Sequence, residues 1–237
     1  SSDVCSSDLV DVLQLQGAVL GSFRRRAQMV FQDPYSSLNP RRTVAQAVLE
    51  PRQVNRMNCE GWLENLLNRV GLLPEHANRF PHQFSGGQRQ RIAIARALAS
   101  QPDLIVADEA VSALDVSIQA QVLNLLADLQ RELNLAILFI SHDLAVIRQV
   151  CSRVAVMYLG QLVELGPAEE VCQRPRPPYT VNLVSSIPGS SRAVPSVQTE
   201  QKESSGCVFA PRCWKAQSVC WQKRPPLQEL ESSHEVH

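Results

Sequence analysis

The chain has 237 residues, 44% of them apolar, which is enough to bury one sizeable core and a small appendage. Lysine and arginine together number 23, as do aspartate and glutamate, so no net field favours nucleic acid or an anionic bilayer. The best apolar stretch, Leu133 to Ile140, is far shorter than the ~20 residues of a membrane-spanning helix. The seven cysteines show no paired pattern and no signal segment opens the sequence, so we expect a reducing cytosolic setting.

The first hundred residues predict a leader, a strand and a helical block. Residues 1–9 nearly duplicate a short polar unit and show no apolar period, so we expect them to be disordered or foreign to the fold. A strand is predicted at Met29 to Phe31, running into a loop at Gln32. From Thr43 to Ser100 the apolar period is helical, and one of these helices is closed by Gly71.

The next segment predicts a strand–helix–strand unit. Short apolar runs at Leu104 to Ala107 and Ala136 to Ile140 are typical of buried strands. The helical period from Val116 to Leu133 is long enough to cross from one parallel strand to the next. A hairpin turning at Gly160 follows, and beyond about residue 170 the composition becomes rich in Pro, Ser and Gln, where we expect the compact core to end.

Two adjacent carboxylates, Asp108 and Glu109, come at the carboxyl end of the first predicted strand of this unit. Ligands of open α/β sheets bind at that edge. Asp108 is placed to hold Mg²⁺ through water, and Glu109 to orient or deprotonate an attacking water. The alternative is an ordinary strand followed by an acidic turn.

The segment from Ser85 to Gln88 precedes a helix predicted from Arg89 to Leu98. Ser85 is a good N-cap residue, and Gly86 and Gly87 expose backbone N–H groups where the helix dipole is positive. This pattern predicts an anion-binding helix start. The alternative is a plain capped helix after a glycine turn.

Together, five segments resemble the motifs of ABC-transporter ATPases. The correspondence covers the signature (Ser85 to Gln88), Walker B (Leu104 to Glu109), the D-loop (Ser112 to Asp115), the switch-histidine loop (Ser141 to Asp143) and the Q-loop glutamine (Gln32). Their order and spacing leave little room for chance. The resemblance covers roughly residues 24–237.

The resemblance implies an ATP site with Mg²⁺ and assigns roles within it. Gln32 would touch the metal or the attacking water and report nucleotide to the membrane subunits, and Asp108 would serve Mg²⁺. Glu109 would act as the base, and His142 would hydrogen-bond the γ-phosphate. A lone histidine is more often structural or solvated, and only the place of His142 after a predicted strand argues otherwise.

The resemblance also implies partners. Ser85, Gly86, Gly87 and Gln88 would bind ATP held by a second ABC ATPase subunit, in a homo- or heterodimer, and Asp115 would shape that partner's site. Two transmembrane permease subunits and an extracytoplasmic peptide-binding protein would complete the assembly, at the cytoplasmic face of the membrane. No nucleic acid is implied.

Two further stretches are similar to the ATPases of oligopeptide and dipeptide importers, some of which serve nickel or glutathione. One is Val30 to Arg41, and the other is the tail with Pro178 to Thr180, Cys207 to Cys213 and Pro225 to Leu227. The implied function is ATP hydrolysis that powers peptide import. The alternatives are a soluble ABC ATPase of DNA repair or translation, and a non-catalytic remnant.

Three cysteines of the tail, Cys207, Cys213 and Cys220, are grouped within about fifteen residues, which in a cytosolic protein suggests metal or cluster ligation more than disulfides. The resemblance implies a [4Fe–4S] cluster in the complete protein, with a fourth cysteine beyond Val236. The alternative is that small cysteines pack a short appendage.

No G-x-x-x-x-G-K-[ST] motif occurs, and all three lysines, Lys202, Lys215 and Lys223, are in the tail. Without that loop the phosphate cradle and a Mg²⁺ ligand are missing. We therefore expect the chain to be truncated before its Walker A loop, and alone neither to bind ATP tightly nor to hydrolyse it.

The fold expected is α/β: a P-loop-type ABC nucleotide-binding domain with an inserted helical subdomain, lacking its N-terminal P-loop segment, plus a small irregular C-terminal extension. The predicted regions are a non-native or disordered leader (1–9), a partial ABC ATPase domain (10–170) with its helical subdomain over about 43–100, and an oligopeptide-transporter-type extension (171–237).

Overall fold

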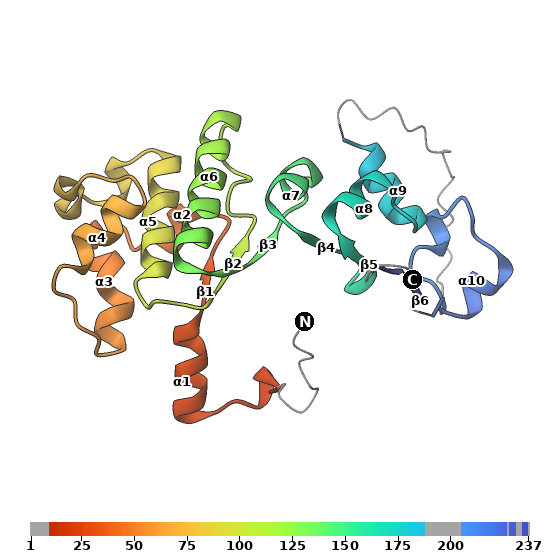
Figure 1. Cartoon of the computed structure of the whole chain (residues 1–237), viewed down its shortest axis with the longest axis horizontal. Coiled ribbons are helices and arrows are strands. Elements are labelled where there is room, and N and C mark those ends of the chain that lie inside the picture. Colours follow the sequence, from red (N-terminus) through yellow and green to blue (C-terminus); the bar gives the residue numbers. More distant parts are fainter. Residues whose placement is uncertain (1–9, 188–204, 227, 231–233, 237) are drawn as a thin grey trace. The chain divides into compact units, whose positions relative to one another are not determined.

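The computed structural model describes residues 10–187, 205–226, 228–230 and 234–236 (Figure 1). Contacts divide the chain into unit 1, Ser1–Ile140, and unit 2, Ser141–His237. The leader predicted at residues 1–9 lies outside the described residues. The domain boundary predicted near residue 170 stays a prediction.

Unit 1 contains a parallel sheet in the order β1 (Ala27–Val30), β2 (Leu104–Asp108) and β3 (Ala136–Ile140). The chain crosses from β2 to β3 through α6 (Val116–Leu133), so the predicted strand–helix–strand unit is confirmed. The carboxyl ends of all three strands therefore lie at one edge of the sheet, because the strands are parallel.

The two faces of this sheet differ in burial. Val30 is aligned with Ala107, and both side chains are buried. On the opposite face Met29, Val106 and Leu138 are in register, and Met29 and Leu138 are 38% and 55% exposed. In the described part of the chain, the face with Val30 and Ala107 is therefore covered by a core, and the face with Met29 and Leu138 is partly open to solvent.

The helical block predicted between residues 43 and 100 is confirmed. Helices α3, α4 and α5 pack together (Figure 1), and Val44, Leu67 and Ile94 are fully buried among them. Gly71, with φ +71°, follows the end of α4 as predicted. The helices of unit 1 besides α6 are α1 (Gly17–Arg26), α2 (Pro34–Ser37), α3 (Val44–Val54), α4 (Trp62–Arg69) and α5 (Gly86–Leu98), with 3₁₀ turns at Val12–Gln14, Pro74–Asn78 and Pro81–Gln83.

Unit 2 is built on the predicted hairpin. Strands β4 (Arg153–Tyr158) and β5 (Gln161–Pro167) pair antiparallel. Leu159 and Gly160 form the turn with φ +47° and +76°, and positive φ at both positions suits a two-residue hairpin. Strands β7 (His234–Val236) and β6 (Gln228–Leu230) extend this sheet.

Aromatic packing joins the hairpin of unit 2 to the C-terminal region. The ring of Tyr158 lies 4.6 Å from that of Tyr179 and 5.3 Å from that of Phe209, between ring centroids. Aromatic pairs at these separations stabilise a fold beyond the area they bury. The helices of unit 2 are α7 (Leu144–Val150), α8 (Ala168–Gln173), α9 (Pro178–Ser185) and α10 (Ser218–Gln222), with a 3₁₀ turn at Ala210–Arg212.

Candidate functional site

The carboxylate pair lies at the end of the central strand of unit 1. Asp108 is the last residue of β2, and the backbone of Glu109 turns to φ +45°. The N–H of Glu109 donates to the carbonyl of Ile140, 2.9 Å away, at the end of β3. A left-handed non-glycine residue is uncommon, and such conformations occur often at functional sites. The turn therefore fixes Glu109 at the sheet edge where ligands bind.

Gln32 reaches the same edge from the neighbouring strand. It follows β1 by two residues, and its Nε2 donates to Oε2 of Glu109 at 2.7 Å. Both side chains are at least partly open to solvent. The structure thus brings together Gln32, Asp108 and Glu109, three of the predicted site residues, which we call the carboxylate edge.

The chain directly after Gln32 is held in a defined turn. The carboxylate of Asp33 accepts from the N–H groups of Tyr35 at 2.8 Å and Ser36 at 3.3 Å. This is an N-cap, which fixes the first turn of α2. Gln32 is therefore followed by a short helix and not by a slack loop.

The predicted anion-binding helix start has the expected cap. The N–H of Gln88 donates to Oγ of Ser85 at 3.3 Å, and the N–H of Ser85 donates to Oε1 of Gln88 at 3.1 Å. This reciprocal capping box begins α5, and Ser85 and Gly86 are exposed. We call Ser85 to Gln88 the signature cap; its capping role was predicted, and its role toward a nucleotide stays a prediction.

The glycines of the signature cap allow a close packing contact that sequence reasoning missed. A Cβ added to Gly87 would lie 2.3 Å from Cγ2 of Ile118, in the first turn of α6, and one added to Gly86 would lie 3.5 Å from Leu114. Only glycine fits at position 87 without a shift of neighbouring atoms. Asp115 is the exposed N-cap residue of α6, so the predicted D-loop residue lies next to the segment on which the signature cap packs.

His142 belongs to unit 2 and is exposed. Next to it Asp143 caps α7, its carboxylate accepting from the N–H of Ala145 at 2.8 Å, and the N–H of Asp143 donates to Oγ of Ser141 at 3.0 Å. His142 is thus presented on a well-ordered turn. Its predicted contact with a γ-phosphate stays a prediction, as does its convergence with Asp108 and Glu109.

The cysteines of the tail approach one another through the backbone. The N–H of Cys207 donates to the carbonyl of Cys220 at 2.8 Å. Burial raises the pKa of the Cys213 thiol, and the neighbouring Cys207 and Cys220 raise it further. Nevertheless, no group of three or more His, Cys, Asp and Glu in the described residues could hold a metal ion. The [4Fe–4S] cluster predicted for the complete protein, which needs a fourth cysteine, stays a prediction.

Among the described helices, none is both long and apolar enough to pass through a bilayer. The family model described as "ABC transporter" matches residues 7–112, which include the carboxylate edge and the signature cap. The model described as "Oligopeptide/dipeptide transporter, C-terminal region" matches residues 163–220.

Several curated proteins are similar to the chain. The oligopeptide transport ATP-binding protein AppF of Bacillus subtilis (strain 168) is 49% identical over 91% of this chain and 70% of its own length. The probable peptide ABC transporter ATP-binding protein y4tS of Sinorhizobium fredii is 49% identical over 95% of this chain and 67% of its own. The glutathione import ATP-binding protein GsiA of Pectobacterium atrosepticum is 58% identical over 74% of this chain, which spans only 29% of that protein.

Among solved structures, cbiO1 of Clostridium perfringens, part of the ABC transporter complex cbiONQ, superposes with a TM-score of 0.61 at 28% identity. The match covers 72% of this chain and 67% of the other. The α/β fold of an ABC nucleotide-binding domain, predicted from the motifs, is confirmed by this likeness.

Proposed function

Because the chain belongs to the ABC transporter family, among the ATP-binding subunits of peptide importers, we propose that the protein hydrolyses ATP to power the import of oligopeptides or dipeptides. The observation that carries the proposal is the 2.7 Å hydrogen bond from Gln32 to Glu109, beside Asp108 at the carboxyl end of β2. A metal-binding carboxylate, a base and an amide that orients water are what phosphoryl transfer to water requires.

In this proposal each group of the carboxylate edge has a separate task. Glu109 accepts a proton from the attacking water, and the amide of Gln32 holds the Glu109 carboxylate in place through Nε2. Gln32 Oε1 is then the atom available to water or metal. Asp108 is the carboxylate that would serve Mg²⁺, which when bound neutralises phosphate charge. Mg²⁺ in such sites takes one or two carboxylates plus substrate phosphates, so this small donor set fits it.

The signature cap and the D-loop residue act toward a second subunit in the same proposal. Exposed Ser85 and the first N–H groups of α5 offer a seat for the phosphates of ATP held by that subunit. Asp115 would shape the partner's site, and His142 would hydrogen-bond the γ-phosphate of its own site. Two permease subunits and an extracytoplasmic binding protein complete the assembly at the cytoplasmic face of the membrane.

The transported substrate has a second candidate. The 58% identity to a glutathione importer subunit is higher than the 49% identity to AppF, although it covers less of the chain. Glutathione is itself a tripeptide thiol, so the two candidates share a peptide backbone. Uptake of labelled oligopeptide in competition with unlabelled glutathione, measured in cells that carry the assembled transporter, would decide between them.

The test of hydrolysis is Glu109→Gln in the full-length protein assembled with its permease. Loss of the base should reduce ATP turnover by a factor on the order of 100 or more, with ATP still bound. Glu132→Gln, which changes an exposed carboxylate near the end of α6, is the control and should leave turnover unchanged. Equal turnover in the Glu109 variant and the wild type would contradict the proposal.

The cysteine-cluster hypothesis for Cys207, Cys213 and Cys220 is a separate prediction. Its test is iron and sulfide analysis of the anaerobically purified full-length protein. Absence of both elements would leave the cysteines as packing residues of the extension.

A further inference from the structure

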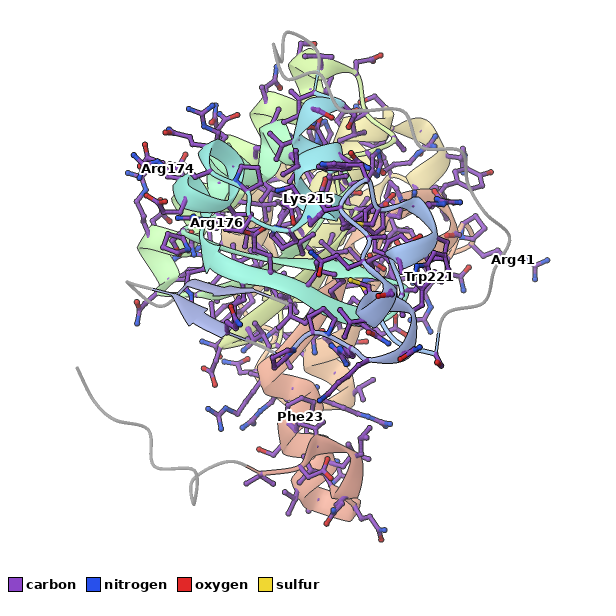
Figure 2. The ribbon with its side chains drawn as sticks, turned by 90° about the vertical axis from the view of Figure 1, so that its right-hand side faces the viewer. Phe23, Arg41, Arg174, Arg176, Lys215 and Trp221 are labelled. Carbon is purple, nitrogen blue, oxygen red and sulfur yellow. The ribbon has the colours of Figure 1, made fainter. Side chains whose placement is uncertain are left out.

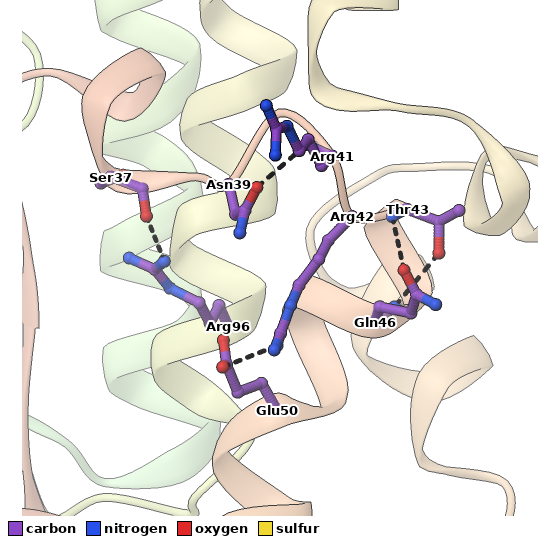
Figure 3. A network of polar contacts seen from close by, with 8 residues as sticks. All are labelled: Ser37, Asn39, Arg41, Arg42, Thr43, Gln46, Glu50 and Arg96. Atoms are coloured by element: carbon purple, nitrogen blue, oxygen red, sulfur yellow. Dashed lines mark hydrogen bonds and ion pairs between the residues drawn. The ribbon is translucent and has the colours of Figure 1, made fainter.

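Helix α5 carries arginines that reach three different parts of unit 1. Nη1 of Arg96 donates to the carbonyl of Ser37, the last residue of α2 (Figure 3). Nη1 of Arg91 donates instead to the carbonyl of Val70 at the end of α4, at 2.8 Å. The same helix thus makes the same kind of bond to two helix ends, and only one of these ends belongs to the segment after Gln32.

Arg89, also on α5, contacts the first turn of α2. The guanidinium carbon of Arg89 lies 5.1 Å from the centre of the Tyr35 ring, a cation–π distance. Its Nε donates to the carbonyl of Pro81 at 2.8 Å, which gives the guanidinium a second point of attachment. Helix α2 is therefore held at Tyr35 and at Ser37 by residues seven positions apart on α5.

A neighbouring carboxylate partly compensates the burial of the Arg96 guanidinium. Burial lowers the pKa of Arg96, and the negative charge of Glu50 opposes that shift. Glu50 is itself paired with Arg42 at 2.6 Å (Figure 3). The adjacent Arg41, by contrast, extends away from the fold (Figure 2). Hydrogen bonds from charged donors are stronger than neutral ones, so the bond from Arg96 is a substantial tether.

We propose that Arg96, assisted by Arg89, is a positioning residue for the reaction at Glu109. The path from Ser37 back to Gln32 is only five residues long and is stiffened by the Asp33 cap. Since Ser85 is the N-cap of α5, the tether joins the segment that follows Gln32 to the helix that carries the signature cap. This inference rests on the proposed ATPase function, and it states that Gln32 and the signature cap of one subunit move together.

The experiment compares Arg96→Gln with Arg91→Gln in the full-length, assembled transporter. Both variants lose one arginine-to-carbonyl bond of α5, so both should lower the unfolding midpoint by similar amounts. Arg96→Gln alone should lower kcat for ATP about 10-fold, because misplacement of an orienting group slows the chemical step. KM for ATP should stay within about twofold in both variants, and Arg96→Lys, which keeps a cationic donor, should recover at least about half of the lost kcat.

A second readout does not depend on hydrolysis. Amide hydrogen exchange of Tyr35 to Ser37 should become faster in Arg96→Gln and stay unchanged in Arg91→Gln, because local opening reports the loss of local contacts. Equal exchange and equal kcat in the two variants would overturn the inference. An inactive wild type would instead defeat the proposed function, and the exchange data would still decide whether the tether exists.

A further variant, Tyr35→Leu, covers the case in which Arg96→Gln does not fold. Tyr35→Leu removes the ring under Arg89 from a side chain that is 59% exposed, so folding should be preserved. We expect kcat to fall about twofold to threefold, in line with a weak exposed cation–π contact. Unchanged kcat and unchanged exchange at Ser36 and Ser37 would remove Arg89 from the proposal.

Discussion

The carboxylate edge and the signature cap of unit 1 are constructed differently. At the edge, the side chains of Gln32 and Glu109 contact each other from two strands. At the cap, the side chains of Ser85 and Gln88 bond to each other's backbone, and Gly87 packs on Ile118. The carboxylate edge therefore depends on how side chains are oriented. The signature cap instead exposes backbone groups, and their position depends on how the helix packs. Substitutions at the two places should fail for different reasons.

Apart from Glu109→Gln, the largest effect is expected for Gly87→Ala. The added Cβ would meet Cγ2 of Ile118 at 2.3 Å, so the start of α5 must shift. Overpacking of this kind costs about 1–3 kcal/mol, and we expect ATP turnover of the assembled transporter to fall about 100-fold. The double variant with Ile118→Ala removes the clashing methyl group and should recover at least about tenfold.

The control for this rescue is Ile118→Ala alone, which should change turnover little. If the double variant is as inactive as Gly87→Ala, the glycine is required for the approach of nucleotide itself and the packing explanation is wrong.

A smaller effect is expected at the carboxylate edge for Gln32→Ala. The change removes the donor to Glu109, so turnover should fall about 10-fold while the unfolding midpoint stays constant, since Gln32 is exposed. Gln28→Ala, which removes a glutamine of β1 that donates to the carbonyl of Arg24 in α1, is the matched control. A loss of turnover common to both variants would mean that β1 and not the Gln32 contact is responsible.

The capping boxes that begin α5 and α3 separate stability from function. Ser85→Ala and Thr43→Ala each remove an N-cap, at α5 and α3, and should each lower the free energy of unfolding by about 1 kcal/mol in denaturant titrations. Only Ser85→Ala should also raise KM for ATP, because only Ser85 belongs to the signature cap. An equal KM in the two variants would speak against a nucleotide contact at Ser85.

The smallest effect concerns the tail, outside both regions. Because burial raises the pKa of Cys213, a smaller fraction of this thiol is ionised at pH 8 than in an unfolded peptide. Alkylation should be a few-fold slower in the folded protein, and its rate should keep rising with pH until the raised pKa is passed. Mass spectrometry of the peptide after timed alkylation, with and without urea, measures this difference; equal rates would contradict it.

Local patterns predicted those parts of the fold that depend on local residues. The bounds of α6 and β3 and the N-cap at Ser85 are as expected, because apolar period and capping act within one or two turns. The first strand was misplaced: β1 begins at Ala27 and ends at Val30, and Phe31, apolar but 46% exposed, lies beyond it. Hydrophobicity alone does not reveal which apolar residue at the end of a strand lies outside the strand and is exposed.

Contacts between distant residues gave no comparable signal. Helix α1 has no buried residue and no side-chain cap, so neither a core contact nor a cap marks it. Ile118 and Arg96 were missed because their partners, Gly87 and Ser37, are 31 and 59 positions away in the sequence. Such pairs are set by how α5 packs on its neighbours and appear only when the helices are assembled.

The left-handed backbone of Glu109 has a consequence for attempts to raise the thermostability of this protein. Glycine adopts that conformation without the penalty borne by a residue with a Cβ, so Glu109→Gly would relax the turn while removing the proposed base. Selection for heat resistance alone would thus favour the loss of this carboxylate. If Glu109 is the base that we propose, thermostability and catalysis compete at this one position, and a stabilised variant is useful only if Glu109 is kept fixed during the search.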